Sequence, residues 1–306
     1  MHGWIILDKP LGLGSTQGVS AVKRALRDAG VPKGVKVGHG GTLDPLATGV
    51  LPIALGEATK LAGRMLDASK VYDFTIRFGE QTSTLDAEGD VVATSAVLPT
   101  LAQVEEVLCR FTGPIEQAPP MYSAIKVDGK RAYDLARAGE AVEMKLRSVT
   151  IYALAVLSPT GEGALDAVTL TAHVSKGTYI RSLARDIALA LGTVGHVVML
   201  RRTKAGPFTL DHAISLDNLA DAARARALER LMLPLTPGLD DIPALTVTSE
   251  EALMLRQGRV LSGDPRKPGF GQGLMLATEG DVPVALVEAQ RSEGRLEIRV
   301  VRGFNL

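Results

Sequence analysis

Residues 233–245, with the sequence L-P-L-T-P-G-L-D-D-I-P-A-L, contain three prolines and show no helical or strand periodicity. Proline fixes φ and removes a backbone hydrogen-bond donor, so neither a long helix nor a central strand can continue through this run. A chain of 306 residues is also about twice the usual length of one domain. The run therefore predicts two domains, at residues 1–240 and 243–306.

Composition bounds the class of protein. Apolar residues make up 46% of the chain and charged residues 22%, which is enough for a core and excludes disorder as the main state. The single cysteine, Cys109, excludes a disulfide framework and a Cys-based structural zinc site. Residues 4–7 are too short a hydrophobic run for a signal peptide, and no run is long enough to cross a membrane. We expect a cytoplasmic protein without membrane contact.

The charges balance in total but not along the chain. There are 34 basic and 34 acidic residues, and a net charge of zero argues at first against nucleic acid as a partner. However, residues 1–70 carry nine Lys/Arg against five Asp/Glu, and residues 173–206 carry six against one. Residues 71–109 and 207–254 are acidic. If the fold brings the two basic blocks to one face, phosphate contacts remain possible there.

Hydrophobic periodicity predicts a mixture of helices and strands. Residues 71–78 alternate as V-Y-D-F-T-I-R-F, which places Tyr72 and Phe74 on one face of a strand. Antiparallel neighbours and long connections favour an α+β fold. Strands are expected at 4–7, 71–78, 149–157, 167–174, 274–277, 284–289 and 296–301, and helices at 17–29, 58–66, 102–110, 131–138, 178–191 and 249–256.

The most informative segment for function is residues 37–52. Its glycines permit close approach of another molecule to the backbone, and Asp44 precedes a proline that forces it into an extended conformation. An acidic side chain is thus fixed on a rigid turn between a glycine loop and an apolar anchor. A turn that only shapes the loop is the alternative for an Asp-Pro pair alone. The longer arrangement favours a functional aspartate.

Residues 174–185 form a second candidate segment. Gly177 leads into a predicted helix whose first turn presents Tyr179 and Arg181. A helix N-terminus beside an arginine can bind a phosphate or a carboxylate such as that of Asp44. A salt bridge that only caps the helix is the alternative.

Cofactor motifs are weak. Gly12, Gly14 and Gly18 have the spacing G-x-G-x-x-x-G, which is not the dinucleotide fingerprint. The five histidines have no metal-ligand spacing. We therefore expect neither a cofactor nor a metal.

Five segments together resemble one family. They are residues 8–12 (DKPLG), 38–49 (GHGGTLDPLATG), 70–72 (KVY), 119–126 (PPMYSAIK) and 175–181 (SKGTYIR). In this order they resemble the bacterial TruB family, the stand-alone tRNA pseudouridine-55 synthases. The family often has Thr or Ser followed by Ser where this chain has Gly14-Ser15. The segment from about residue 243 resembles, more loosely, the PUA-type RNA-binding domain of these enzymes.

The resemblance implies a fold and an activity. The fold is an α+β pseudouridine synthase catalytic domain with a mixed or antiparallel sheet, followed by a small β-barrel-like PUA-type domain. The activity is isomerisation of uridine 55 in the T loop of tRNA by base flipping, with cleavage and re-formation of the glycosidic bond. It implies no cofactor, no obligate protein partner and a monomer. Two alternatives are the archaeal and eukaryotic relative that works with a guide RNA, and an RNA-folding helper that binds tRNA. The compact C-terminus, without a basic tail, favours the stand-alone enzyme.

The resemblance also implies roles for individual residues. Asp44 is the catalytic residue, as a nucleophile or as a proton acceptor, and Arg181 keeps it ionised. Tyr72 stacks on the uracil and is a candidate for handling the proton at the base carbon. His39 occupies the space left by the flipped nucleotide, and Tyr179 and Leu200 complete the pocket. Lys9 and Pro10 brace the catalytic loop.

Overall fold

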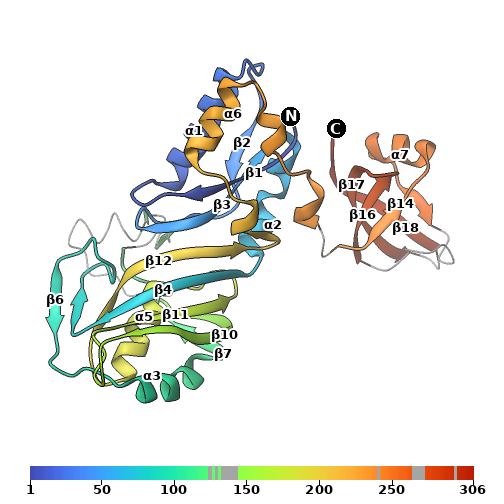
Figure 1. Ribbon diagram of the computed structural model, residues 1–306. Coiled ribbons are helices and arrows are strands. Elements are labelled where there is room, and N and C mark those ends of the chain that lie inside the picture. The colour runs from blue at the N-terminus through green and yellow to red at the C-terminus, as the bar shows by residue number, and fades with distance from the viewer. Residues whose placement is uncertain (123–125, 128–129, 132–143, 240–241, 264–272, 293–294) are drawn as a thin grey trace.

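The computed structural model describes residues 1–306 except 123–125, 128–129, 132–143, 240–241, 264–272 and 293–294 (Figure 1). A mixed sheet of nine strands runs through the larger part of the molecule, and a separate five-stranded sheet forms the C-terminal part. The predicted helix at 131–138 falls almost entirely on residues 132–143, outside the described residues.

The large sheet has the order β1-β3-β12-β4-β11-β10-β7, with β2 beside β3 and β13 beside β12. Only β3 and β12 run parallel; the other pairs are antiparallel. The mixed sheet of an α+β fold is therefore confirmed. Its strands are β1 Gly3–Lys9, β2 Val37–His39, β3 Ala47–Leu55, β4 Lys70–Phe78, β7 Gly113–Gln117, β10 Arg147–Thr160, β11 Ala167–Val174, β12 Gly195–Ala205 and β13 Phe208–Thr209.

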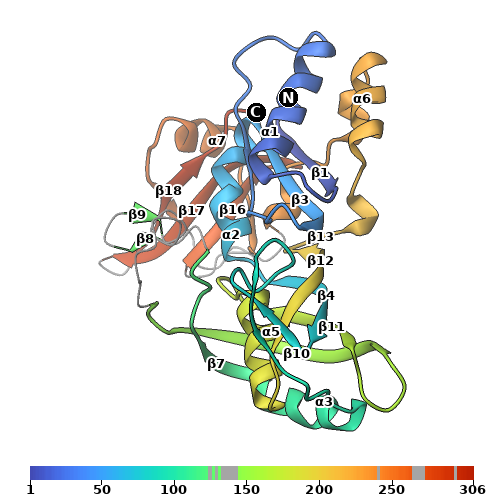
Figure 2. The same ribbon diagram turned by 90° about the vertical axis from the view of Figure 1, so that its left-hand side faces the viewer.

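Helices cover the two halves of this sheet separately. α3 and α5 lie against β4, β11 and β10, whereas α1 and α6 lie against β1 and β3 (Figures 1 and 2). The helices are α1 Ser15–Asp28, α2 Ala62–Asp67, α3 Leu101–Leu108, α5 Ile180–Ala190 and α6 Leu216–Arg224, and two short strand pairs are β5 Glu80–Thr82 with β6 Val91–Thr94 and β8 Lys126–Val127 with β9 Lys130–Arg131.

The predicted helix at 58–66 is only partly α-helical. Gly56–Leu61 forms a 3-10 helix that runs directly into the short helix α2. The hydroxyl of Thr59 donates a hydrogen bond of 2.7 Å to the carbonyl of Gly56, which favours the tighter turn. Helical periodicity does not distinguish these two helix types over so few residues.

Strand β4 follows the predicted alternation. Phe74, Ile76 and Phe78 are buried beneath α5, and Tyr72 on the same face is half-buried. Tyr72 and Leu200 of β12 each contact both hydrophobic clusters, the one beneath α5 and the one beneath α1 and α6. These two side chains therefore lie where the two halves of the sheet meet.

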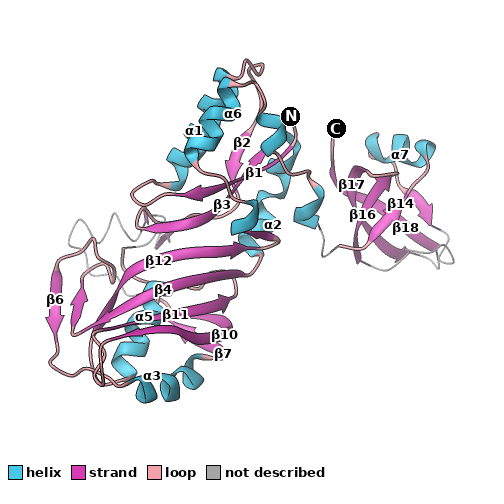
Figure 3. Ribbon diagram, viewed as in Figure 1, coloured by secondary structure: helices cyan, strands magenta, loops and turns pink. Residues whose placement is uncertain are grey.

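The C-terminal part is a curled five-stranded sheet with one helix (Figure 3). Its order is β14-β16-β17-β18-β15. Helix α7 Ser249–Arg256 covers it and has the predicted bounds, fixed by a Thr248–Glu251 capping box. The strands are β14 Ala244–Thr246, β15 Leu261–Gly263, β16 Gly273–Glu279, β17 Val282–Ser292 and β18 Arg295–Gly303.

The proline-rich run is packed against the protein rather than exposed. Leu233 exchanges two backbone hydrogen bonds with Trp4, of 2.9 and 2.8 Å. Leu235 and Leu239 are buried in a cluster that also holds Phe304 from the C-terminal part. The two parts of the molecule thus share an apolar contact.

Candidate functional site

Asp44 occupies a turn directly before β3. Its carbonyl accepts a 3.0 Å hydrogen bond from the amide of Ala47, which closes the turn predicted from the Asp-Pro pair. The carbonyl of the adjacent Pro45 accepts a 2.9 Å hydrogen bond from the amide of Gly12. The backbone is held on both sides, while the Asp44 side chain remains 46% exposed. The turn therefore presents a carboxylate to the outside from a fixed backbone.

Two side chains from β1 and α1 hold this turn from beneath. Lys9 is fully buried, and its ammonium donates hydrogen bonds to the carbonyls of Pro10, Leu13 and Pro45 at 3.1, 2.6 and 3.2 Å. Ser15 accepts from the amide of Leu43 at 2.8 Å and donates to its carbonyl at 2.9 Å. Pro10 is exposed and takes part through its carbonyl alone.

Arg202 of β12 holds the other side of the loop. It is 1% exposed, and its guanidinium donates to the carbonyls of Val50, Thr42 and Gly41 at 2.8, 3.3 and 3.2 Å. Gly49 lies so close that a Cβ there would be 2.2 Å from the carbonyl oxygen of Arg202. Only glycine fits at this contact.

Arg181 joins Asp44 to a second carboxylate. Its Nη2 lies 2.9 Å from Oδ2 of Asp44, and its Nη1 lies 3.0 Å from Oδ2 of Asp86. The same guanidinium donates to the carbonyls of Thr84 and Tyr122, both at 3.0 Å. Arg181 is nearly buried on α5, so these contacts hold it in one orientation.

Asp86 was not among the site residues predicted from the sequence. Its side chain is 6% exposed and accepts hydrogen bonds at 2.5 Å from the hydroxyl of Thr84 and at 3.0 Å from the amide of Glu88. Leu85, immediately before it, has a positive φ of 62°, an unfavourable conformation for a branched residue. The signal in the sequence was a T-S-T-L-D run inside an acidic block, which alone does not distinguish Asp86 from its acidic neighbours.

Tyr179 is positioned by a buried glutamine. Gln117, at the end of β7, accepts from the amide of Tyr179 at 2.7 Å and donates to its carbonyl at 3.1 Å. Ser182 in the first turn of α5 also donates to the carbonyl of Ala118, at 2.7 Å. Gln117 at the end of β7 and Ala118 directly after it therefore fix the N-terminus of α5.

These elements enclose a cavity of about 320 Å³. Among the predicted site residues, those that line it are Asp44, Tyr72, Tyr179, Arg181 and Leu200. His39, Lys9 and Pro10 are not part of the lining. The fold thus brings together residues from β4, α5, β12 and the Asp44 turn, although they are far apart in the sequence.

His39 lies at the end of β2, beside the glycine loop. It is half-buried, and its Nδ1 has no hydrogen-bond partner among the described residues. Burial, and secondarily the charge of Arg202, lowers the pKa of His39 and favours the neutral ring.

Two lysines near the cavity carry lowered pKa values. Burial lowers the pKa of Lys9 to about 8, against the opposing attraction of Asp44. Burial and the nearby Arg202 lower the pKa of Lys70, which lines the cavity, to about 8. Lys70 donates to the carbonyls of Leu66 and Ala68 at the end of α2, at 2.7 and 2.6 Å.

The arrangement can hold a flat ring beside one reactive carboxylate. Tyr72, Tyr179 and Leu200 supply apolar walls, and Arg181 supplies a fixed positive charge next to Asp44. Asp86 is fully engaged by Arg181, Thr84 and Glu88, so the pair of free carboxylates that hydrolysis of a glycoside requires is not formed by Asp44 and Asp86.

The described residues contain no group of His, Cys, Asp or Glu side chains arranged to hold a metal ion. Nor does any described helix combine the length and hydrophobicity needed to span a bilayer.

Comparison with known families and sequences gives consistent matches. The family described as "TruB family pseudouridylate synthase (N terminal domain)" matches residues 27–180, and "tRNA pseudouridylate synthase B C-terminal domain" matches residues 181–240. The tRNA pseudouridine synthase B of Novosphingobium aromaticivorans is 65% identical over all of this chain and 98% of its own length. That of Zymomonas mobilis is 58% identical over all of this chain and 96% of its own length.

Solved structures show the same architecture. An H/ACA ribonucleoprotein bound to a substrate RNA containing 2'-deoxyuridine includes a chain that aligns with a TM-score of 0.72 and 26% identity, covering 99% of this chain and 85% of that one. A Cbf5-Nop10-Gar1 complex includes a chain that aligns with a TM-score of 0.70 and 29% identity, covering 99% and 84%.

Proposed function

Because the chain belongs to the TruB family of pseudouridylate synthases, we propose that it isomerises uridine 55 in the T loop of tRNA to pseudouridine. The observation that carries this proposal is the ion pair between Arg181 and Asp44, at 2.9 Å, inside a cavity walled by aromatic and aliphatic side chains. The relatives named tRNA pseudouridine synthase B support tRNA as the substrate.

The target uridine reaches the site by leaving its stack. Asp44 lines a cavity together with Tyr72 and Tyr179, and we expect a base that is stacked inside an RNA loop to enter this cavity by being flipped out of the stack. Tyr72 stacks on the flipped uracil, while Tyr179 and Leu200 close the pocket around it. His39, with its ring held neutral, fills the position that the nucleotide leaves.

Asp44 assists cleavage of the bond between N1 of the uracil and C1′ of the ribose. The detached base turns and forms a new bond from C5 to C1′; N1 then carries a proton, and C5 loses one. Tyr72 is placed to handle that proton. The product is an isomer of the substrate, so the reaction consumes no water and needs no redox cofactor. Arg181, itself held by Asp86, orients the Asp44 carboxylate through their ion pair.

The enzyme works as a monomer without guide RNA, and its two domains divide the work. Residues 1–240 perform catalysis, with Lys9 and Pro10 bracing the Asp44 turn, and residues 243–306 act as a PUA-like RNA-binding domain that contacts the tRNA. Exposed arginines on its strands, such as Arg291 and Arg302, support this role because they can contact phosphates.

The decisive experiment uses the purified chain alone with an unmodified tRNA transcript, without added guide RNA, and maps pseudouridine by position. We expect modification at uridine 55, and none in a matched transcript with cytidine at that position. Asp44→Asn should bind the transcript as the wild type does while the rate falls by roughly 10³-fold or more, because the pocket stays intact and the carboxylate is lost.

Three outcomes would contradict parts of the proposal. Pseudouridine elsewhere in the transcript would reject the position while leaving the family activity in place. Undiminished product from Asp44→Asn would reject the role of Asp44. No modification unless guide RNA is supplied would favour the guide-dependent alternative, and binding without any modification would favour an RNA-folding helper.

The RNA-binding role of residues 243–306 has its own test. Removing the segment would uncover the buried Leu235 and Leu239, so substitutions are the better probe. Arg291→Gln with Arg302→Gln should weaken tRNA affinity by roughly fivefold or more at 0.1 M salt if both contact phosphates. Filter binding measures this, and an unchanged Kd would reject phosphate contacts by these arginines.

A further inference from the structure

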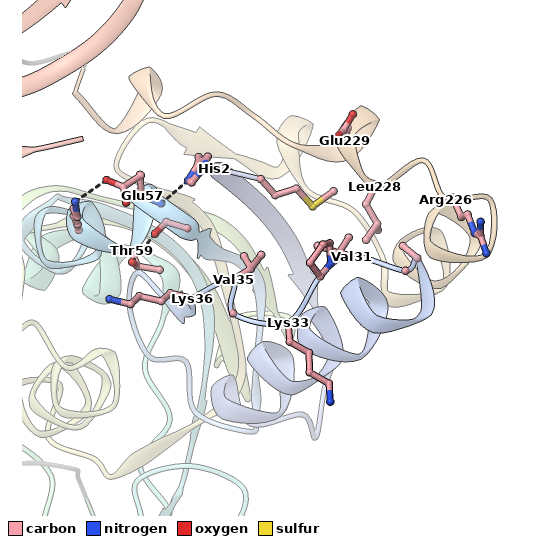
Figure 4. A pocket seen from close by; sticks show the side chains of 17 residues that line it. His2, Val31, Lys33, Val35, Lys36, Glu57, Thr59, Arg226, Leu228 and Glu229 are labelled. Carbon is pink, nitrogen blue, oxygen red and sulfur yellow. Dashed lines mark hydrogen bonds and ion pairs between the residues drawn. The ribbon is translucent and has the colours of Figure 1, made fainter. Parts of the chain in front are cut away.

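Figure 4 shows a second and larger cavity, of about 830 Å³. Four separate segments line it: the chain start, the loop at 29–36 after α1, the beginning of the 3-10 helix Gly56–Leu61, and the connection after α6 at 226–229. It shares no lining residue with the cavity that holds Asp44. We call it the cationic cleft.

The charged side chains that line the cleft are basic in excess: Lys33, Lys36, Lys60 and Arg226 outnumber Glu57 and Glu229, which leaves a net charge of +2. Lys33, Lys36 and Arg226 are exposed, and none of them pairs with a carboxylate among the described residues. Burial alone would raise the pKa of Glu57, but hydrogen bonds from Lys60 and the Asn305 amide lower it below its usual value. Glu57 is therefore ionised and already neutralised by Lys60, 2.6 Å away, so it does not compensate the three free cations.

Arg226 has a left-handed backbone conformation that is unfavourable for a residue other than glycine. It follows the end of α6 with a φ of 53°, and its amide and that of Ala227 bond back to Ala223 and Ala222 at 3.0 and 2.8 Å. This is the helix-ending geometry at which glycine or asparagine is usual. Among the described residues only Leu85 and Arg226 are non-glycine residues with positive φ. Leu85 adjoins Asp86 in the catalytic site, and such strained residues concentrate at functional sites.

The cleft is connected to the catalytic site by a short strand. Lys36 directly precedes β2, and its carbonyl accepts a 2.8 Å hydrogen bond from the amide of Gly56. β2 ends three residues later at His39, roughly 10 Å away at the usual rise of a strand. An RNA whose flipped nucleotide enters the catalytic cavity could thus extend its backbone to the cleft.

We propose that the cationic cleft binds phosphate groups of the RNA backbone through Lys33, Lys36 and Arg226. The proposal rests on the proposed function, because it takes the RNA substrate as the ligand. Exposed, unpaired ammonium and guanidinium groups bind phosphates by releasing condensed counterions, which makes the affinity depend on salt. The surplus charge of the cleft fits this polyanion better than it fits a neutral or cationic ligand.

The test measures Kd for an unmodified tRNA transcript by filter binding from 50 to 300 mM KCl. Lys33→Gln with Lys36→Gln should weaken binding by roughly fivefold to tenfold for each contact at 0.1 M salt, and should lower the slope of log K against log salt by about 0.9 per contact. A matched control is Arg77→Gln with Arg110→Gln, which removes two exposed cations outside the cleft, one on β4 and one directly after α3. The control should change neither quantity.

The variant Arg226→Gly distinguishes a role of Arg226 in RNA binding from a role in stability. Glycine suits the backbone at this position, so the urea midpoint of the variant should stay unchanged or rise while the affinity for the transcript falls. A lower midpoint with unchanged affinity would give Arg226 a structural role and overturn its part in the proposal.

The failure of this inference differs from failure of the proposed function. If the wild type modifies uridine 55 but the lysine double variant keeps the wild-type Kd and salt slope, the cleft does not bind RNA. If the double variant loses affinity and slope while the wild type produces no pseudouridine, the cleft binds RNA and the proposed function fails.

Discussion

The catalytic cavity and the cationic cleft are both rich in basic residues, but they hold their cations in opposite ways. At the cavity, Lys9, Arg181 and Arg202 are buried and donate to carbonyls or carboxylates of the protein itself. In the cleft, Lys33 and Arg226 are exposed and have no such acceptor among the described residues. A buried cation needs hydrogen-bond acceptors or a carboxylate of the protein itself, because leaving it unpaired and away from water costs a large free energy.

This contrast changes the meaning of the basic blocks at 1–70 and 173–206. The fold does bring them together, since β12 pairs with β3 and β4. However, several of their cations fix the backbone around Asp44 and are not available to phosphates. The basic residues in these two blocks therefore contribute more to the rigidity of the loop around Asp44 than to affinity for RNA.

The largest effect that tests this contrast is on stability. Arg202→Met should lower the free energy of unfolding by about 3 kcal/mol or more, because it leaves buried carbonyls at Gly41, Thr42 and Val50 without a donor. The neighbouring Arg201→Met is the matched control. Arg201 is half-exposed and pairs with Asp8, so its loss should cost less than about 1 kcal/mol.

Urea unfolding at neutral pH measures both variants. Equal losses would show that the buried arginine is no more important to the fold than its half-exposed neighbour. Hydrogen-bonded buried cations would then contribute no more to stability than half-exposed ones.

A smaller effect is expected on the rate when the support of Arg181 is weakened. Asp86→Asn keeps the size of the side chain but removes the charge that pairs with Arg181 at 3.0 Å. We expect single-turnover isomerisation to slow by roughly 10- to 100-fold, because a small displacement of Arg181 misorients Asp44. RNA affinity should be retained, since Asp86 is buried. An unchanged rate would mean that Thr84 and Tyr122 suffice to hold Arg181.

The smallest effect concerns pH. In the folded protein the pKa of Lys70 is lowered to about 8 from an ordinary value of 10.5, so the unfolded chain binds more protons between these values. The contribution of Lys70 to stability therefore rises as pH increases from about 8 to 10.5. Lys70→Met should flatten the pH dependence of the urea midpoint in this window. An unchanged slope would mean that Lys70 titrates normally and is not desolvated in the folded protein.

Much of the local structure was predictable because it depends on neighbours in sequence. The alternation at 71–78 predicted the buried face of β4, the Asp-Pro pair predicted the Asp44 turn, and the helix predicted at 249–256 is α7. The α+β class and the TruB family followed from the same residues and are confirmed. The roles of Asp44, Tyr72 and Arg181 stay predictions until the mutants are measured.

Other features could not be read in this way. Asp86 belongs to the site through its ion pair with Arg181, which lies 95 positions later in the sequence. The prolines at 233–245 signalled a break, but the burial of Leu235 and Leu239 depended on Trp4 and Phe304. These contacts join residues far apart in sequence, and no local pattern encodes them.

The sequence by itself therefore determined the family, the position of the Asp44 turn and many of the elements, since propensity, turn chemistry and motif spacing are local. Strands β3 and β12 and helix α6 were not among the predicted elements. Only the tertiary structure decided which charges face inward and which remain free. A cation can face inward only where the fold places an acceptor beside it. Arg202 is buried and donates to the carbonyl of Val50, whereas Arg226 remains exposed to water.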